Sequence, residues 1–467
     1  MKPAITRRKF LSSLALGTAG VVLAACQPTP TPVPPTKAPQ PAATAAATSA
    51  PKPTTAPTAV PTAAPKAKVE LRMGNWGGQA RNELYNKICD LYQQKYPNVT
   101  IVRELAPWSD YWTKKATQAA SGSLPDVTGS VIDSLSEYAK RGAYAPLDPY
   151  IEQKVIDISD WDPMVVNAGK VDGKVYSMAS GVTSNCVIVN QDMIKRNGLQ
   201  PPKFETTFAE FAELCRALQP KLGKNVWATS FGGGYSEHFQ SWVLQKGYQI
   251  CNQDATDVGF PKEVMIDFFK YWYDLYKAGV VIPIEVSSQP MGDAWADSFL
   301  AKRQVALFYI NTNQLKIYQK YTKDDLVIMR NPLMPDGKHK TGEYLRPSSL
   351  SISTNSKLKD EAAKFVNFFV NDVEATKIFN MELGAVGPKH VQEALAKSID
   401  PKDVLVLDHF NKIVKDIPPK IPDPKGTPAV LAAHRRAAEA IQHGTAIEKA
   451  VDTFMAEAKE AYAVNKS

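Results

Sequence analysis

Short apolar strand patterns alternate with longer amphipathic helix patterns from Val69 onward, and this alternation constrains the fold more than any other feature. Val69–Met73 alternates apolar and polar residues, as a half-buried strand does, and a helix pattern follows from Arg81 to Tyr96. The same order recurs with a strand at Val99–Val102 and a strand–helix pair over residues 126–141. Strands that alternate with helices are typical of a mostly parallel sheet covered by helices, so we predict the α/β class.

The middle of the chain repeats this order. Val187–Val189 predicts a buried strand, and Thr207 with Glu210 predicts a capping box at the start of a helix. Further segments are predicted by the same patterns: helices near 236–248, 262–278 and 294–302, strands at 305–310, 326–329 and 350–353, and mostly helix from 358 onward. The globular part, about 400 residues long, exceeds what one hydrophobic core usually serves, so we expect two domains.

The N-terminus carries two export signals. Arg7 and Arg8 precede an aromatic residue and a leucine, which is the order of a twin-arginine signal. The apolar stretch Leu14–Ala25 is too short to span a bilayer comfortably, and it ends in Leu23-Ala24-Ala25-Cys26, which resembles a bacterial lipobox. We therefore predict a signal peptide over residues 1–26 and a lipid on Cys26 that holds the chain on the outer face of the cell membrane. An uncleaved N-terminal membrane helix is the alternative.

Residues 27–68 consist mainly of Pro, Thr, Ala and Lys and contain no acidic or aromatic residue. Such a composition cannot bury enough apolar surface to fold, so we predict a disordered, extended linker. The segment thus predicts a tethered globular domain, which is compatible with either a binding protein or a surface enzyme.

The formal net charge of +8 belongs to the predicted signal and linker. The basic residues of these two segments are Lys2, Arg7, Arg8, Lys9, Lys37, Lys52, Lys66 and Lys68. Residues 69–467 are therefore formally neutral, which argues against a nucleic-acid partner and against a polyanionic ligand attracted by net charge.

The sequence contains no recognisable enzyme motif and no cysteine pair spaced for zinc. We expect no catalytic residue, no metal and no cofactor. Cys89, Cys186, Cys215 and Cys251 are expected to be buried thiols, with a disulfide between two of them as the alternative.

The order of several motifs resembles family 1 of bacterial extracellular solute-binding proteins, the maltose-binding-like subunits of ABC importers. Asp172-Gly173-Lys174-Val175-Tyr176, then Val189-Asn190-Gln191-Asp192-Met193-Ile194 and Asn197-Gly198-Leu199, is similar to the family passage DGKxY…YNxDLFxxxGL. Residues 201–211, 299–307 and 357–369 resemble three later family motifs. The chain departs from these motifs at Val189, Phe208 and Lys302, where the family commonly has tyrosine, tryptophan and glycine.

This resemblance implies two lobes, each a mostly parallel sheet flanked by helices, with a ligand cleft between them. The expected N-terminal lobe comprises residues 69–182 and 305–346, and the expected C-terminal lobe comprises 183–304 and 347–467. It also implies an extracytoplasmic monomer that captures a small-molecule solute by cleft closure and delivers it to the membrane subunits of an ABC permease.

A sugar offers apolar ring faces and a rim of hydroxyl groups, so its site needs flat aromatic side chains and planar hydrogen-bonding groups. Candidates in loops and at strand ends are Trp76, Gly77, Trp108, Asp133, Ser134, Asn185, Phe231, Tyr235, Trp242, Trp295, Asn311, Asn313 and Arg346. A carbohydrate is therefore the predicted solute. A polyamine or a peptide is the alternative within the family, and an anchored glycoside hydrolase is the alternative from another class.

Overall fold

The computed structural model describes residues 67–288, 295–418 and 423–465. The chain divides into two units, residues 1–64 and 65–467, and the described residues belong to the second. The predicted signal peptide, Cys26 and almost all of the predicted linker therefore lie outside the described residues. None of the helices in the described part of the chain combines the length and apolar character that a bilayer crossing requires.

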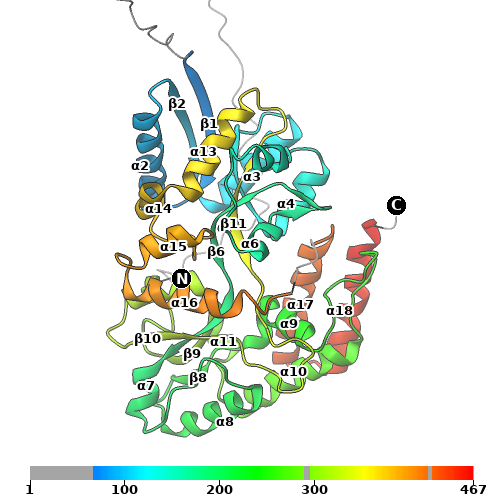
Figure 1. Ribbon diagram of the computed structural model, residues 1–467. Coiled ribbons are helices and arrows are strands. Elements are labelled where there is room, and N and C mark those ends of the chain that lie inside the picture. The colour runs from blue at the N-terminus through cyan, green and yellow to red at the C-terminus, as the bar shows by residue number, and fades with distance from the viewer. Residues whose placement is uncertain (1–66, 289–294, 419–422, 466–467) are drawn as a thin grey trace, which may run out of the picture. The chain divides into compact units, whose positions relative to one another are not determined.

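The first lobe is built on a five-stranded sheet in the order β2-β1-β3-β11-β6 (Figure 1). Its strands are β1 (Val69–Trp76), β2 (Val99–Ala106), β3 (Val127–Val131), β6 (Met178–Thr183) and β11 (Arg346–Ile352). β1 runs parallel to β2 and β3, whereas β11 runs antiparallel to β3 and β6. The strand–helix alternation predicted for the first part of the chain is confirmed.

The second lobe is built on a four-stranded sheet in the order β10-β7-β9-β8. Its strands are β7 (Asn185–Asn190), β8 (Trp227–Thr229), β9 (Val305–Asn311) and β10 (Leu326–Met329). β7 is antiparallel to both β9 and β10, and only β8 and β9 are parallel. Both sheets are thus mixed rather than mostly parallel, because strands that follow a crossing between the lobes enter the next sheet from the opposite direction.

The strand pairing also corrects the predicted lobe boundaries. β9 and β10 pair in the second sheet, so residues 305–329 do not belong to the N-terminal lobe as expected. β11 lies between β3 and β6 in the first sheet, so residues 346–352 do not belong to the C-terminal lobe. Local patterns identify a strand, but the choice of sheet depends on partners more than a hundred residues away.

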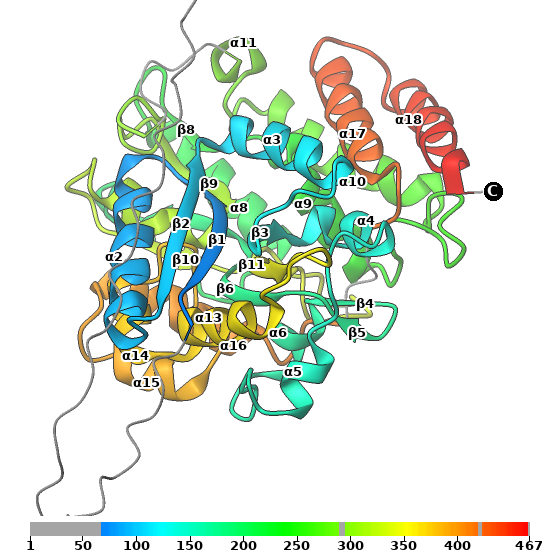
Figure 2. The same ribbon diagram turned by 90° about the horizontal axis from the view of Figure 1, so that it is seen from above.

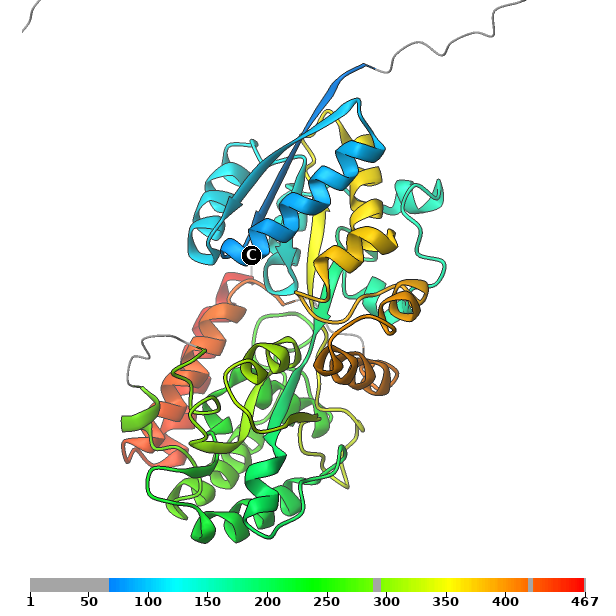
Figure 3. The same cartoon turned by 90° about the vertical axis from the view of Figure 1, so that its left-hand side faces the viewer.

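Helices cover both faces of the first sheet (Figures 2 and 3). α2 (Gln79–Lys95), α13 (Lys359–Asn371) and α14 (Val373–Phe379) pack on one face, and α3 (Trp108–Ala120) and α4 (Ile132–Lys140) pack on the other. Smaller elements complete this lobe: α5 (Asp148–Glu152), α6 (Pro163–Asn167), β4 (Lys170–Val171), β5 (Lys174–Val175) and α15 (Lys389–Leu395).

The second lobe is mainly helical around its sheet. Its helices are α7 (Gln191–Arg196), α8 (Phe208–Leu218), η1 (Gln219–Lys221), η2 (Gly232–Gly234), α9 (Ser236–Gln245), α10 (Lys262–Lys277), α11 (Ile284–Ser287), η3 (Thr312–Gln314), α12 (Leu315–Gln319), α16 (Pro401–Ile413), α17 (Thr427–Gln442), α18 (Ile447–Tyr462) and η4 (Ala463–Asn465). α17 and α18 lie side by side and pack on α10 (Figure 2).

The predicted capping box at the start of α8 is confirmed. The Thr207 hydroxyl accepts from the Glu210 backbone N–H, and the Glu210 carboxylate accepts from the Thr207 backbone N–H, so two donors at the helix start are satisfied. The helix predicted over residues 294–302 is wrong from Trp295 onward, where the chain forms turns. The Ser298 hydroxyl accepts from the Ala301 N–H there and competes with the helical hydrogen bonds.

The cores are apolar and rich in aromatic rings. Trp272, Phe211 and Tyr309 pack at the centre of the second lobe, whereas Tyr85 and Phe369 pack α2 against α13 in the first. Cys89, Cys186 and Cys215 are buried free thiols, as predicted, and Cys251 is also buried.

Candidate functional site

A cavity of about 590 Å³ lies where the two sheets meet. It is lined by Trp76, Gly77, Gly78, Arg81, Trp108, Val131, Ile132, Asp133, Thr183, Trp295, Asn311, Asn313, Gln314, Arg346, Pro347, Ser348 and Leu383. β1, β3 and β6 end at this cavity from the first lobe, and β9 ends at it from the second. Ligands commonly bind outside the carboxyl ends of strands and between domains, so the topology itself places a site here.

Two tryptophans form the wall on the side of the first lobe. Trp76 is 4% exposed and is held by Trp108, Tyr111 and Trp112, with ring centroids 5.2–5.6 Å away. Trp108 is 54% exposed and therefore offers the larger free surface to a ligand. Flat apolar rings of this kind can pack against the apolar face of a sugar.

Arg346 is the central charged group of the cavity. Its Nη2 lies 2.6 Å from Oδ2 of Asp133 in the first lobe, and its Nη1 lies 3.8 Å from Oε1 of Glu237 in the second. Burial lowers the pKa of Arg346, but the carboxylates of Asp133, Glu237 and Asp423 outweigh it and raise that pKa overall. The Arg346 guanidinium is thus neutralised by carboxylates of both lobes.

Sequence reasoning missed several lining residues. Arg81 lies on α2 and pairs with Glu382 at 3.1 Å, and an arginine on an amphipathic helix gives no sign in the sequence that it faces a cavity. Thr183, Gln314 and Ser348 add hydroxyl and amide groups. The positions of Thr183 and Ser348 near strand ends were a usable signal, because both residues flank crossings between the lobes.

The structure brings together most of the predicted residues in this one cavity. Those that line it are Trp76, Gly77, Trp108, Asp133, Trp295, Asn311, Asn313 and Arg346. The other five lie elsewhere. Ser134 donates to the Val131 carbonyl within its own helix start. Phe231 and Tyr235 line a second cavity of about 460 Å³ within the second lobe.

Trp242 and Asn185 are held inside the protein rather than facing the cavity. Trp242 packs edge-on against Phe208 at 4.8 Å, because α9 is buried on all sides and offers no free face. Asn185 is 2% exposed, and its amide donates to the Ser241 hydroxyl at 3.0 Å and to the Gly342 carbonyl. The polar groups of Asn185 instead take part in a buried hydrogen-bond network.

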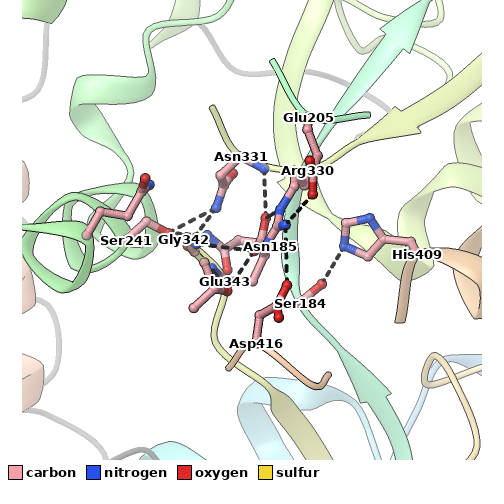
Figure 4. Close-up of polar contacts among 12 residues, drawn as sticks. Ser184, Asn185, Glu205, Ser241, Arg330, Asn331, Gly342, Glu343, His409 and Asp416 are labelled. Carbon is pink, nitrogen blue, oxygen red and sulfur yellow. Dashed lines mark hydrogen bonds and ion pairs between the residues drawn. The ribbon is translucent and has the colours of Figure 1, made fainter. Parts of the chain in front are cut away.

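This buried network lies where the chain crosses between the lobes (Figure 4). Its centre is Glu343, which is fully buried and pairs with Arg330 at 2.8 Å. Arg330 also lies 3.3 Å from Glu205 and 3.8 Å from Asp416, both partly exposed. The crossing between β6 and β7 joins it through the side-chain Oδ1 of Asn185, which accepts from the Tyr344 backbone N–H, so this crossing is tied to the one between β10 and β11.

His409 belongs to the same region. Its Nε2 lies 3.0 Å from the Ser184 hydroxyl, and Ser184 exchanges backbone and side-chain hydrogen bonds with Thr312 at the end of β9. Burial lowers the pKa of His409 to about 4, so the ring is neutral at physiological pH. The crossings are thus fixed by neutral and paired groups.

Acidic side chains are sparse in the wall of the cavity. Of the described residues that line it, Asp133 is the one carboxylate, and it is paired with Arg346. A glycoside hydrolase needs two carboxylates across the scissile bond. Within the described ranges, no group of three or more His, Cys, Asp or Glu side chains is placed to hold a metal ion.

Comparison with known proteins agrees with this architecture. Residues 87–398 match the family model described as bacterial extracellular solute-binding protein. The maltotriose-binding protein of Pyrococcus abyssi is 22% identical over 315 residues, which cover 67% of this chain and 65% of that relative.

Solved structures show the same fold. A periplasmic solute-binding protein from Pectobacterium atrosepticum superposes with a TM-score of 0.75 at 21% identity, covering 85% of this chain and 99% of its own. The sugar-binding protein MalE from Xanthomonas citri gives a TM-score of 0.73 at 17% identity, covering 85% and 98%. At such identities the likeness shows a shared two-lobed architecture.

Proposed function

The chain belongs to the family of bacterial extracellular solute-binding proteins, and from this premise we propose that it captures a carbohydrate for an ABC importer. The observation that carries the proposal is the cavity between the sheets, where the Trp76–Trp108 wall lies together with the amides of Asn311 and Asn313. Aromatic faces and planar amides are the groups that a mono- or oligosaccharide requires. The maltotriose-binding relative supports the same choice.

The charges of the cavity favour an uncharged solute. Arg81 is paired with Glu382, and Arg346 is paired with Asp133, so neither cation is left to hold an anionic ligand. The same pairing leaves no free carboxylate among the described lining residues for a polyamine. A peptide remains the rival solute, because amide side chains can form hydrogen bonds with a peptide as well as with a sugar.

Transport follows from closure of the two lobes. Arg346 already contacts Asp133 of one lobe and Glu237 of the other, so a solute that tightens these contacts stabilises the closed form. The permease then responds to the closed shape. In this proposal the protein itself makes and breaks no covalent bond, so its role is binding and not catalysis.

The test is a thermal-shift screen of the purified full-length chain against mono- and oligosaccharides, polyamines and peptides, followed by calorimetry. A true ligand at about 100 times its dissociation constant stabilises the folded state by about 2.7 kcal/mol. We expect Trp108→Ala to weaken sugar binding about fivefold, since an aromatic contact is worth about 1 kcal/mol. Tyr321→Ala is the matched control, because this exposed ring lies outside the cavity.

Stabilisation by peptides or polyamines but by no sugar contradicts the carbohydrate proposal. Hydrolysis of chromogenic glycosides that depends on Asp133 contradicts a role limited to binding. If Trp108→Ala binds the sugar with unchanged affinity, the aromatic wall is not part of the binding site.

We also propose that the protein is a monomer anchored by lipid on Cys26 to the outer face of the cell membrane. The lipobox-like sequence and the twin arginines Arg7 and Arg8 support this location. Metabolic labelling with a fatty acid should mark the parent chain, and Cys26→Ser should release it from membranes. Equal membrane retention of Cys26→Ser contradicts the anchor.

A further inference from the structure

A lysine is buried directly behind the aromatic wall of the cavity. Lys115 lies on α3 and is 1% exposed, whereas its neighbour Lys114 is half exposed and pairs with Glu104. The Lys115 amino group donates to the backbone carbonyl of Gly129 in β3. In the described part of the chain it has no carboxylate within ion-pair distance.

Aromatic rings enclose this amino group. Its Nζ lies 4.5 Å from the centre of the Trp112 ring and 4.9 Å from that of Tyr138, and Tyr111 and Tyr144 follow at 5.4 Å. A protonated amine is attracted to ring faces at these distances, and the N–H donates to Gly129 in either protonation state. Burial lowers the pKa of Lys115 well below its usual range, so keeping this group inside costs stability.

Gly129 connects the lysine to the cavity. Its carbonyl also accepts from the Tyr111 hydroxyl at 2.6 Å. A Cβ atom on Gly129 would lie 2.7 Å from Cζ3 of Trp76, so the indole packs directly on the Gly129 backbone. Lys115 and Tyr111 thus both hold β3 through the Gly129 carbonyl, and Trp76 packs on the backbone of this same strand.

Trp112 provides a second connection. Its ring lies 5.6 Å from that of Trp76 and 5.3 Å from that of Trp108, and the centre of the same ring lies 4.5 Å from the Lys115 amino group. Displacement of Trp112 therefore moves both cavity tryptophans. Lys115 touches the wall through two independent routes without lining the cavity itself.

We propose that Lys115 is a positioning residue of the solute site, which fixes Trp76 and Trp108 by holding the Gly129 carbonyl and the face of Trp112. This inference rests on the proposed function, because it assumes that the two tryptophans contact the solute. The lysine acts on affinity through the geometry of the rings. Its cost in stability is offset by a wall that does not need to be ordered when the solute arrives.

The experiment compares Lys115→Met, which keeps the length of the side chain and removes the amino group, with Lys114→Met on the same helix. The first measurement needs no sugar: the near-UV circular dichroism of the full-length chain reports the packing of Trp76, Trp108 and Trp112. The second is calorimetry with maltotriose as the probe. A urea titration of each variant establishes that it is folded.

We expect Lys115→Met to stay folded, to alter the near-UV tryptophan bands, and to weaken maltotriose binding at least tenfold, equivalent to about 1.4 kcal/mol. Lys114→Met should match the parent in both measurements. Folded Lys115→Met with the parent spectrum and the parent affinity overturns the proposal. If Lys115→Met fails to fold, Lys115→Arg replaces it: a spectrum like the parent's supports the role of the donor, and an altered spectrum with parent affinity overturns it.

The two readouts separate this proposal from the proposed function. A parent chain that binds no sugar while Lys115→Met still changes the near-UV bands contradicts the carbohydrate function and supports the positioning of the rings. A parent that binds maltotriose, together with a Lys115→Met variant that binds it equally well, contradicts the role of Lys115 alone.

Discussion

Replacing Glu343 by glutamine tests whether the buried network holds the β6–β7 and β10–β11 crossings between the lobes. The Glu343 carboxylate is fully buried and accepts from five donors. These donors are Nε and Nη2 of Arg330, the backbone N–H groups of Asn331 and Gly342, and the Thr341 hydroxyl. Glutamine has the same shape but only one acceptor oxygen.

The magnitude follows from how the donors divide between the two oxygens. Oε1 accepts from Asn331 and one Arg330 nitrogen, and Oε2 accepts from the other Arg330 nitrogen, Thr341 and Gly342. Whichever way the new amide turns, its NH₂ group faces at least two buried donors. Each buried donor left unsatisfied costs about 1–3 kcal/mol, and breaking a buried ion pair costs about 3–5 kcal/mol. Because Glu205 and Asp416 still face Arg330, we expect Glu343→Gln to cost about 3 kcal/mol.

Urea unfolding of the full-length chain at pH 7, followed by far-UV circular dichroism, measures this loss. Glu205→Gln is the matched control: it removes a carboxylate 3.3 Å from the same Arg330, but Glu205 is 65% exposed, so the loss should stay below about 1 kcal/mol. A change below about 1 kcal/mol for Glu343→Gln refutes the reasoning, since it means that the donors find other partners at little cost.

Further predictions concern the buried histidines, the Gly129 backbone beneath Trp76 and the start of α8. Burial lowers the pKa of His238 and His434 to about 3 and that of His409 to about 4, so the unfolded chain takes up these protons first as pH falls below about 6.5. The free energy of unfolding should therefore fall by about 1.4 kcal/mol per buried histidine between pH 7.5 and 5.5. In urea titrations at these two pH values, His434→Phe should reduce the total fall by about 1.4 kcal/mol. The same pH dependence in His434→Phe as in the parent contradicts the prediction. Gly129→Ala should push against the side chains of Asn75 and Trp76 and cost about 1–3 kcal/mol in the same assay, together with weaker sugar binding by calorimetry. Gly223→Ala, where a Cβ meets open space, should be neutral, and equal effects of the two changes would refute the close approach. Thr207→Ala should cost about 1 kcal/mol by urea unfolding, because it removes half of the capping box, and no loss would show that the box is dispensable.

Local structure was predictable because its causes are local. The alternation in Val69–Met73 and the capping residues Thr207 and Glu210 act on neighbouring backbone, and the structure confirms both elements. The sheet to which a strand belongs is a different matter. β9 and β10 were expected in the first lobe, and they pair with β7 because long-range register, not their own sequence, selects the partner.

The candidate site was predictable to the extent that strand ends mark it. Trp76, Asn311 and Arg346 each adjoin a strand end, and all three line the cavity. Asn185 also begins a strand, but its amide donates hydrogen bonds to Ser241 and Gly342. No pattern in the sequence near residue 185 predicts these two partners. Lys115 shows the opposite case, since a lysine on an amphipathic helix is ordinarily solvated, and only the tertiary structure reveals the rings around it.

The insertion of β11 between β3 and β6 sets the order in which this protein can be completed during synthesis. The hydroxyls of Ser130 and Ser351 lie 3.0 Å apart across β3 and β11, yet they are 221 positions apart in the chain. A ribosome therefore releases β3 and β6 long before the strand that joins them exists, and both keep an open edge in the meantime. The sheet that is begun first is therefore completed last, and a nascent chain that stops short of Ile352 lacks an interior strand of that sheet rather than an edge strand.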